Sequence, residues 1–336
     1  MDKPIKGAVI GYGGAFNMGL RHAQYMLQHG IAFAAACDLD PERVEQAKQD
    51  FPNIDTYTSV EELLANDEIN LVTVITPHHT HAQLAEQILE AGKHCILEKP
   101  MCIHADDAER LVQLARARGL MLSVYHNRRW DGWYLTVKDL IAKGIIGDVF
   151  HVEMFSGGYS EPKAWWRSIK EVSGGVFYDW GAHYVDYLLG IMPGPVTGVR
   201  GYIHNRVWDK ISNEDQMDSI ISFASGAVAN VQISTIAHAG RPAFRLLGSK
   251  GAIVDQTLGD GELTLYTELE GVKIETKVPC QPSQQERYYA NIADHLMRGA
   301  DLIVKPEQAR RTIAIIETTE KSALAGRELD VPYEQV

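Results

Sequence analysis

The sequence has few cysteines and no long apolar run, and each scarcity narrows what the protein can be. Four cysteines occur in 336 residues, at Cys37, Cys95, Cys102 and Cys280, and none forms a Cys-x-x-Cys pair. We therefore expect reduced thiols in a cytoplasmic protein, not a disulfide framework or a zinc site. The longest apolar stretches, such as Ile31–Cys37, are too short to span a bilayer, and the first residues offer no signal-peptide core. A membrane partner is not expected.

Positive charge is also scarce. Lys and Arg total 32 against 44 Asp and Glu, which gives a formal net charge of −12. A surface that acidic repels phosphate backbones, so nucleic acid is not an expected partner. The remaining composition, 45% hydrophobic and 23% charged, is typical of an ordinary globular protein. Because 336 residues exceed what one core comfortably covers, two domains are expected.

In the first part of the chain, short β-rich runs alternate with amphipathic helical segments. Strands that are apolar on both faces, each followed by a helix, predict a doubly wound parallel sheet in an α/β fold. The expected strands are Ile5–Ile10, Ala32–Cys37, Thr56–Tyr57, Leu71–Ile75, His94–Leu97 and Met121–Val124. The expected helices are Met18–His29, Pro41–Asp50, a segment from Val60, His79–Ala91 and Ala105–Arg118.

The second part of the chain has mostly strands, with few helices between them. Such a pattern predicts an α+β domain with a mixed or antiparallel sheet and helices on one face. The helices are expected at Gly132–Lys143, Asp179–Leu189, Gln284–Met297 and Pro306–Ala325. We predict a nucleotide-binding domain over residues 1–125 and a substrate-binding and oligomerisation domain over residues 126–336, with the last helix able to pack back on the first domain.

A glycine-rich turn follows the first expected strand. Gly11, Gly13 and Gly19 match a dinucleotide-binding turn, in which glycines let the backbone approach a pyrophosphate and the helix N-terminus supplies N–H donors. Compared with Gly-x-Gly-x-x-Gly, the turn carries extra residues at Gly14-Ala15-Phe16, so a larger loop is expected. One hypothesis is that Phe16 covers part of the bound cofactor and slows its release; the alternative places Phe16 in the domain core.

Asp38 ends the second expected strand. A carboxylate there accepts hydrogen bonds from both ribose hydroxyls and repels a 2′-phosphate, so it predicts NAD in preference to NADP. A glycine loop shaped only for close packing is the alternative interpretation of the turn.

Lys99 lies at the carboxyl end of the fifth expected strand, where ligands bind in this architecture. Pro100 restricts the backbone of Lys99 and can adopt the cis form, which would aim the lysine side chain. A lysine in this place suits orienting a substrate hydroxyl and stabilising an alkoxide. The alternative is a solvated surface lysine.

These motifs together resemble the glucose–fructose oxidoreductase/inositol dehydrogenase/MocA (Gfo/Idh/MocA) family. Glu98-Lys99-Pro100 resembles its Glu-Lys-Pro motif, and the glycine turn is similar too. The other matching segments are Thr76-Pro77-x-x-x-His81, Asn127-Arg128-Arg129, Trp166-Arg167 and Asp179-Trp180-Gly181-Ala182-His183. The chain departs from the family at the extended glycine loop and at His78, where the family commonly has Asn.

The resemblance implies a Rossmann domain, a C-terminal α/β domain whose large open sheet often forms the oligomer interface, and NAD(P)-linked oxidation of sugars, inositols or related polyols. It implies a catalytic role for Lys99, Asp179 and His183, with His183 as the base. The expected cofactor-binding residues are Gly11, Gly13, Gly14, Ala15, Phe16, Asn17, Asp38, Thr76, Pro77, His78, His81, Glu98, Lys99, Asn127, Trp166 and Arg167. The expected substrate-binding residues are Lys99, Arg128, Trp165, Asp179 and His183.

Other interpretations of the Asp-x-Gly-x-His segment stay open at this point. Asp179, His183 and Asp186 share one face of a helix, so they could simply pair at a surface or chelate a metal. No thiolate or further imidazole joins them in the sequence, and we expect no metal. Trp165 and Trp166 could form a wall against which a sugar ring stacks, or they could be packing residues.

The sequence therefore predicts an NAD-dependent dehydrogenase that oxidises a secondary hydroxyl of a sugar, glycoside or inositol, as a homodimer or homotetramer through the C-terminal sheet. An alternative is NAD-dependent glycoside cleavage by transient oxidation, elimination and re-reduction. A third, from another class, is a non-catalytic NAD-binding sensor.

Overall fold

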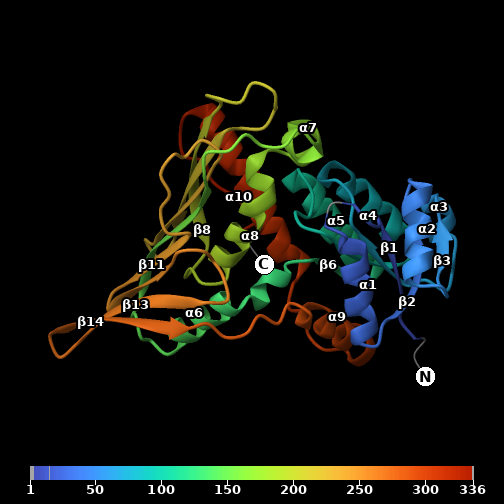
Figure 1. Cartoon of the computed structure of the whole chain (residues 1–336), viewed down its shortest axis with the longest axis horizontal. Coiled ribbons are helices and arrows are strands. Elements are labelled where there is room, and N and C mark those ends of the chain that lie inside the picture. Colours follow the sequence, from blue (N-terminus) through green and yellow to red (C-terminus); the bar gives the residue numbers. More distant parts are fainter. Residues whose placement is uncertain (1–3, 15, 335–336) are drawn as a thin grey trace. The chain divides into compact units, whose positions relative to one another are not determined.

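The computed structural model describes residues 4–14 and 16–334. Contacts between Cα atoms divide the chain into two compact units. Unit 1 holds the residues up to Cys102, Asp106–His126 and Glu286–Arg310. Unit 2 holds Ile103–Ala105, Asn127–Gln285 and the residues from Arg311 on. Figure 1 shows the helices and strands of both and labels most of them.

Unit 1 is built on a six-stranded parallel sheet with the strand order β3-β2-β1-β4-β5-β6. The strands are β1 (Lys6–Ile10), β2 (Ala32–Cys37), β3 (Asp55–Tyr57), β4 (Leu71–Val74), β5 (His94–Leu97) and β6 (Leu122–Val124). The helices are α1 (Met18–Gln28), α2 (Pro41–Asp50), α3 (Val60–Leu64), α4 (His81–Glu90), α5 (Ala105–Arg118) and α9 (Arg287–Arg298). The order reverses at β1, so the crevice for a dinucleotide is expected outside the carboxyl ends of β1 and β4.

Local chemistry explains why these elements form where the sequence predicts them. Val72 and Ile96, in the central strands β4 and β5, are fully buried, as expected for strands covered on both faces. Helix α2 begins after Asp40, whose side chain accepts the Glu42 amide, and Pro41 occupies its first turn. Several boundaries differ from the prediction by one to three residues, and a separate 3₁₀ turn, His78–Thr80, precedes α4.

Unit 2 is built on an eight-stranded sheet with the order β14-β13-β12-β11-β7-β10-β9-β8, in which β7 and β10 run parallel and the other neighbours antiparallel. Its strands are β7 (Val149–Gly157), β8 (Val196–His204), β9 (Gln216–Phe223), β10 (Val228–Ser234), β11 (Phe244–Gly248), β12 (Gly251–Asp255), β13 (Glu262–Leu269) and β14 (Val272–Pro279). Its helices are α6 (Gly132–Ala142), α7 (Lys170–Ser173), α8 (Val176–Leu189) and most of α10 (Pro306–Ala325).

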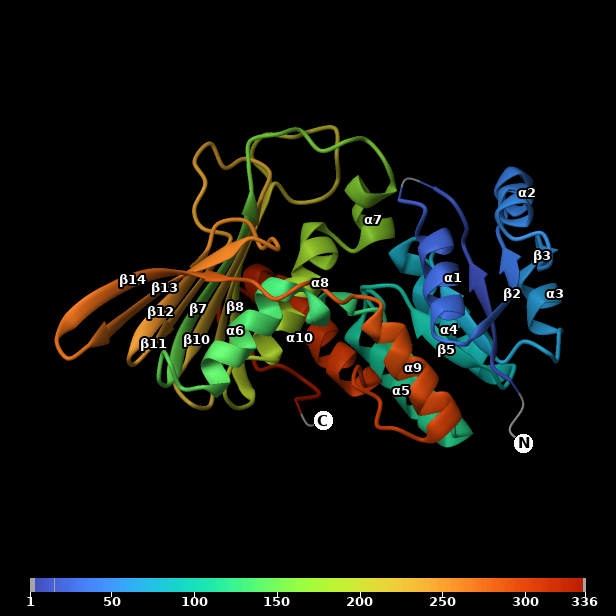
Figure 2. The same cartoon turned by 60° about the horizontal axis from the view of Figure 1, so that its bottom comes forward.

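One face of this sheet carries the core of unit 2. Helices α6, α8 and α10 lie on the same side of the strands (Figure 2). Along β9 the burial alternates residue by residue, with Met217, Ser219 and Ile221 turned inward. Helix α10 approaches β9 closely, since the Ser219 and Thr319 hydroxyls lie 2.8 Å apart. The predicted fold class, a doubly wound parallel sheet followed by an α+β domain with a large mixed sheet, is confirmed.

Helix α8 begins at Val176, earlier than the predicted Asp179. Its N-cap, Gly175, has a positive φ of 122° and no side chain that could accept a hydrogen bond from the first backbone N–H groups of the helix. The missing acceptor comes instead from a residue distant in the sequence, Glu214, whose Oε2 accepts the Val176 N–H at 3.0 Å. The sequence around α8 therefore could not reveal where this helix starts.

Candidate active site

The glycine turn of unit 1 has the backbone shape that a pyrophosphate site needs. Gly11, Gly13 and Gly14 all adopt positive φ angles, of 96°, 71° and 74°. A Cβ on Gly11 would lie 2.3 Å from the Ile75 carbonyl oxygen, so only glycine lets β1 and the end of β4 approach this closely. Gly19 has a similar task in α1, where a Cβ would lie 2.7 Å from the Tyr12 ring. The turn therefore fits a dinucleotide phosphate.

The loop between these glycines and α1 is extended, and α1 begins at Met18. Ala15 lies outside the residues that the structure describes. Phe16 is 59% exposed, so its ring is not in the core of unit 1. Asn17 has a left-handed backbone with φ 44°, and its N–H donates to the Gly14 carbonyl at 3.3 Å. This exposed ring at the mouth of the turn is compatible with the hypothesis that Phe16 lies against a bound cofactor.

Asp38 lies at the end of β2 and is 8% exposed. Its Oδ2 accepts the Tyr12 N–H at 2.8 Å and its Oδ1 accepts the Asp40 N–H at 3.0 Å. A carboxylate offers further lone pairs, so this fixed group can still accept ribose hydroxyls. Arg43, which the sequence reasoning did not consider, places its Nη1 3.6 Å from Asp38 Oδ2. An arginine near this position is a usual feature of 2′-phosphate sites.

The Thr76-Pro77-x-x-x-His81 segment lies beyond β4. His81 is fully buried: its Nδ1 lies 2.8 Å from the Pro100 carbonyl oxygen and its Nε2 lies 2.9 Å from that of Thr76. Burial lowers the pKa of His81, and the two carbonyls and the Glu98 charge oppose that shift less strongly. His78 is 3% exposed. The His81 ring thus joins the loop after β4 to the loop after β5.

Glu98, Lys99 and Pro100 follow β5, and the Lys99–Pro100 peptide bond is cis. Glu98 Oε1 lies 3.1 Å from His22 Nε2, while its Oε2 accepts the Lys99 N–H at 3.0 Å. The other ring nitrogen of His22 lies 2.8 Å from the Tyr289 hydroxyl. Burial of Glu98 raises its pKa, but the His22 hydrogen bond and the charges of His22 and Lys99 outweigh this effect and keep the pKa below its ordinary value. His22 and Glu98 thus fix the backbone from which Lys99 projects.

Helix α8 of unit 2 carries the Asp-x-Gly-x-His segment. Arg167 Nη1 donates to both oxygens of Asp179 at 2.8 Å. His183 is 6% exposed, and its ring lies 5.8 Å from the Trp180 ring, edge to face. Asp186 is buried and paired with Arg129 through two hydrogen bonds of 2.8 and 2.6 Å. The helix face predicted from the spacing therefore exists, and arginines hold both of its carboxylates.

The remaining predicted residues of unit 2 surround this helix. Arg128 donates to Asp131 at 3.1 Å and its guanidinium lies 5.0 Å from the Trp180 ring centre. The Arg167 guanidinium lies 5.3 Å from the Trp165 ring and 5.1 Å from the Trp166 ring. Asn127 donates to the Gln285 side chain at 3.0 Å. Trp165, Trp166 and Asp179 thus share one arginine.

A cavity of about 350 Å³ opens in unit 2 beside Asp179. Its lining combines indole rings with polar side chains. Trp165, Trp180, Arg167, Asp179, Asn213 and Glu214 are among the lining residues. Apolar walls with a few fixed polar groups are the usual composition of a small-molecule site.

No group of three or more His, Cys, Asp or Glu side chains able to hold a metal is found over residues 4–14 and 16–334. Nor does this described part contain a helix long and apolar enough to cross a membrane. None of the four cysteines forms a disulfide bond.

Sequence reasoning missed His22, Arg43, Lys170, Asn213 and Glu214. Arg43 had a usable signal, because it falls in the first turn of the helix that follows the Asp38 strand end. The others are ordinary polar residues in sequence, and only folding brings them beside Glu98 or α8.

Two family models match the chain. Residues 5–126 match the "Oxidoreductase family, NAD-binding Rossmann fold" model, and residues 134–254 match the "GFO/IDH/MocA C-terminal domain" model. The chain belongs to the Gfo/Idh/MocA family. As a Gfo/Idh/MocA protein, it is an NAD(P)-dependent oxidoreductase that acts on CH–OH groups.

Similar proteins and solved structures support this membership. The chain is 29% identical over 312 residues to scyllo-inositol 2-dehydrogenase (NADP(+)) IolW of Bacillus subtilis, covering 85% of each chain. It is 26% identical to the NAD-binding protein from Listeria innocua, with a TM-score of 0.86 over 99% of this chain and 98% of that one. It shares the fold of levoglucosan dehydrogenase, whose structure was solved with NADH. The TM-score is 0.85 and the identity 20%, over 98% of this chain and 99% of that one.

Proposed function

We propose that the protein is an NAD-dependent dehydrogenase that oxidises a secondary hydroxyl of a neutral sugar, glycoside or inositol, with unit 1 binding the cofactor and unit 2 the substrate. The observation that carries the substrate class is the cavity beside Asp179. Indole faces suit the C–H face of a sugar ring, while Asn213 and Asp179 can exchange hydrogen bonds with its hydroxyls. Its carboxylates already have cationic partners, Arg167 for Asp179 and Lys170 for Glu214, which favours an uncharged ligand.

In this proposal His183 and Lys99 have different roles at the reacting hydroxyl. His183 removes the hydroxyl proton, since an imidazole has an ordinary pKa suited to a base near neutral pH. Lys99 stabilises the negative charge that develops on the same oxygen. Asp179, fixed by Arg167, binds a neighbouring hydroxyl. When bound, the nicotinamide supplies the hydride acceptor.

The preference for NAD rests on Asp38, which would face the 2′-phosphate of NADP. Gly11, Gly13 and Gly14 would hold the pyrophosphate, with Asn17 and Phe16 at the rim of the turn. Two facts limit this preference: the relative IolW is named as NADP(+)-dependent, and Arg43 lies beside Asp38 in this chain. We therefore expect NAD to bind at least about tenfold tighter than NADP, not exclusively.

The experiment is a turnover assay with NAD on scyllo-inositol, myo-inositol, levoglucosan and a set of simple glycosides, following NADH at 340 nm and aglycone release. Stoichiometric NADH without aglycone release supports the dehydrogenase. Aglycone release with NAD merely recycled would replace it with redox-neutral glycoside cleavage. A thermal-shift response to NAD without turnover of any compound would replace it with a sensor.

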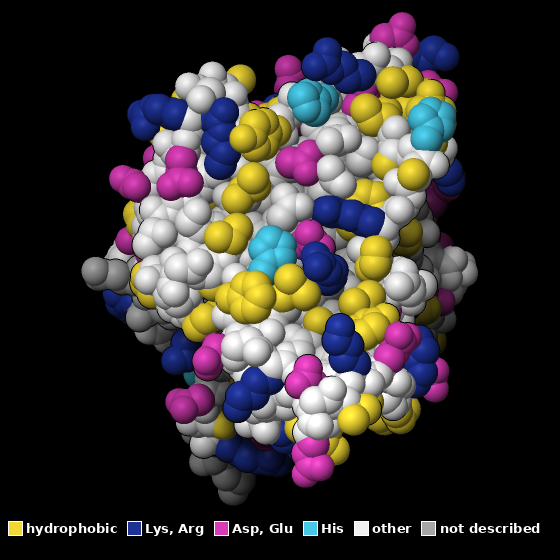
Figure 3. Space-filling model, turned by 90° about the vertical axis from the view of Figure 1, so that its left-hand side faces the viewer, with side chains coloured by type: hydrophobic (Ala, Val, Ile, Leu, Met, Phe, Trp, Pro, Cys, Tyr) yellow, Lys and Arg dark blue, Asp and Glu magenta, His cyan; other side chains and the backbone are white. Residues whose placement is uncertain are grey.

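We also propose a homodimer or homotetramer in the cytoplasm, assembled through the open face of the eight-stranded sheet. Figure 3 looks onto that face, where apolar side chains lie among charged ones and histidine. Tyr202 and Tyr266 project from it and are 43% and 39% exposed. Large sheet faces with exposed aromatic residues are typical of protein interfaces. Light scattering measures the molecular mass of the unmodified protein and of the Tyr202→Glu variant in solution. A monomeric unmodified protein would contradict the proposed assembly.

A further inference from the structure

Helix α8 starts at an N-terminus that its own sequence does not cap. Its N-cap is Gly175, and a Cβ there would lie 2.8 Å from Glu214 Oε2. Glycine at this position therefore leaves room for the carboxylate of Glu214, which comes from the loop between β8 and β9. A negative charge at a helix N-terminus is stabilising because it satisfies an orphan amide and complements the helix dipole.

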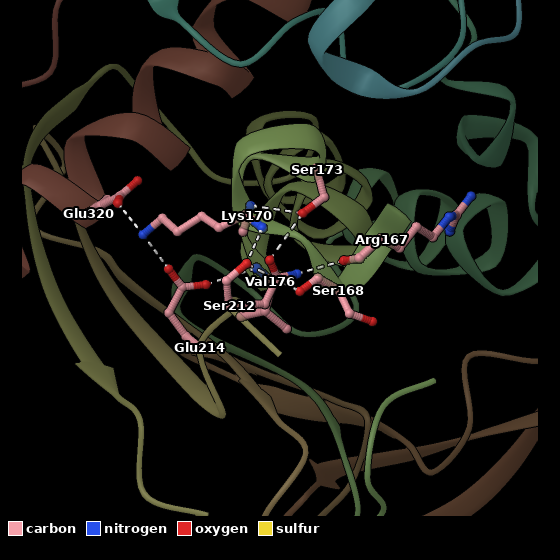
Figure 4. A network of polar contacts seen from close by, with 10 residues as sticks. Arg167, Ser168, Lys170, Ser173, Val176, Ser212, Glu214 and Glu320 are labelled. Atoms are coloured by element: carbon pink, nitrogen blue, oxygen red, sulfur yellow. Dashed lines mark hydrogen bonds and ion pairs between the residues drawn. The ribbon is translucent and has the colours of Figure 1, made fainter. Parts of the chain in front are cut away.

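The carboxylate itself is firmly held. The Glu214 side chain is 4% exposed, and Lys170 Nζ donates to its Oε1 at 2.5 Å. Lys170 also donates to Glu320 of α10, so one ammonium group lies between two carboxylates (Figure 4). A buried carboxylate without such a partner would be costly. Burial alone would lower the pKa of Lys170, but its hydrogen bonds with Glu214 and Glu320 raise it above the ordinary value.

The residue before Glu214 holds the segment that precedes α8. Asn213 Nδ2 donates to the Arg167 carbonyl at 2.6 Å, and Ser173 Oγ donates to Asn213 Oδ1 at 3.1 Å. Arg167 in turn donates to Asp179. Two adjacent residues of one loop therefore fix the start of α8 and the backbone of the arginine that pairs with Asp179, and both line the cavity.

We propose that Glu214 is a positioning residue that caps α8 through the Val176 N–H and thereby holds Asp179 and His183 in place for catalysis. The proposal rests on the proposed function for its catalytic consequence, while the capping itself does not depend on it. Glu214 acts through the helix and does not transfer the proton.

The test compares Glu214→Ala and Glu214→Gln with the unmodified protein. Hydrogen exchange read by mass spectrometry on a peptide over the first turn of α8 should be on the order of tenfold faster in Glu214→Ala, because the acceptor is lost. In Glu214→Gln the single amide oxygen can accept the Val176 N–H or Lys170 Nζ but not both, so exchange should rise less than in Glu214→Ala. On the polyol that the unmodified protein oxidises fastest, kcat should fall at least about tenfold in Glu214→Ala, with the Kd for NADH unchanged, and recover in part in Glu214→Gln.

Glu153→Gln is the matched control, because Glu153 also forms an ion pair in unit 2, with Arg245 at 2.9 Å on the sheet. It should leave both exchange at α8 and kcat unchanged. If Glu214→Ala does not fold, Lys170→Met takes its place, and exchange at α8 should rise at least about threefold because Glu214 loses its tether.

Unchanged exchange at α8 in Glu214→Ala, or in Lys170→Met where that variant replaces it, overturns the proposal. Faster exchange with an unchanged kcat overturns it as well. If the unmodified protein oxidises no polyol, the proposed function has failed, and the exchange measurement alone then decides whether Glu214 caps α8.

Discussion

The two units hold their candidate side chains in different ways. In unit 1, Asp38 accepts two backbone amides and His81 lies between two backbone carbonyls. In unit 2, opposite charges do this work: Arg167 pairs with Asp179, Arg129 with Asp186 and Lys170 with Glu214. Two unit charges 4 Å apart attract by about 1 kcal/mol in water and about 4 kcal/mol near a protein surface, so the burial of each pair decides its strength.

This difference suits the two tasks that we propose. Groups held by the backbone at the edge of a parallel sheet have one geometry, which suits a cofactor of constant shape. A side chain held by an ion pair can give up one hydrogen bond to its partner and bind a ligand instead. Asp179 could bind a substrate hydroxyl in this way while Arg167 remains beside it.

His183→Asn should remove most of the activity, with kcat falling about 10³-fold, because the amide cannot take a proton. The remaining activity should lose the acidic limb of the pH–rate profile. The profile of kcat/KM between pH 5 and 9 measures both effects. An unchanged profile in a variant that retains measurable activity would assign the base to another residue.

Lys99→Ala should lower kcat by about 10²-fold or more while NADH binding, followed by fluorescence, stays within about twofold, since the lysine acts on the reacting oxygen. Near-full activity would leave Lys99 with a structural role. A tenfold weaker Kd for NADH would instead move it to the cofactor site.

Asp38→Ala should narrow the preference for NAD over NADP by about tenfold, because the carboxylate would no longer repel the 2′-phosphate. Arg43→Ala should act in the opposite direction and widen the preference. Calorimetric Kd values for both cofactors measure the ratio, and equal affinities in the unmodified protein would exclude Asp38 as a selector.

Phe16→Ala should raise the NADH off-rate about tenfold in stopped-flow displacement. Covering the cofactor with one phenyl ring stabilises the complex by roughly 1.5–3 kcal/mol, which corresponds to a ten- to hundredfold change. The melting temperature should hardly change, since this ring is 59% exposed. An unaltered off-rate rules out a covering role.

Glu98→Gln should lower the melting temperature of the cofactor-free protein by about 3–6 °C at pH 7, because it removes a partly buried charge-assisted hydrogen bond worth about 1.5 kcal/mol. The folded pKa of Glu98 lies below the ordinary 4.5, so its charge contributes stability above that pH and loses it as the pH falls further. The gap between variant and unmodified protein should therefore shrink toward pH 4.

Glu153→Gln, which removes an ion pair on the sheet of unit 2, should change the melting temperature by less than about 2 °C at pH 7. An equal loss in the two variants would show that the Glu98–His22 contact contributes no more stability than a more exposed ion pair.

The parts of this protein that depend on local spacing could be predicted from the sequence. The glycine turn, the position of Asp38 at the end of β2 and the place of Lys99 after β5 follow from apolar runs, turn residues and the strand order they imply. The parallel sheet brings the carboxyl ends of its strands to one edge, where His81 contacts the loops after β4 and β5.

The contacts that support the candidate side chains could not be predicted in this way, because they form between residues far apart in the sequence. Glu214 caps a helix 38 positions away, and His22 contacts Glu98 across 76 positions. No period or motif connects such residues, because each contact depends on how helices and loops pack after the elements have formed. For the same physical reason the start of α8 was placed too late: its first amide bonds to a carboxylate that folding, and not the local sequence, brings to Gly175.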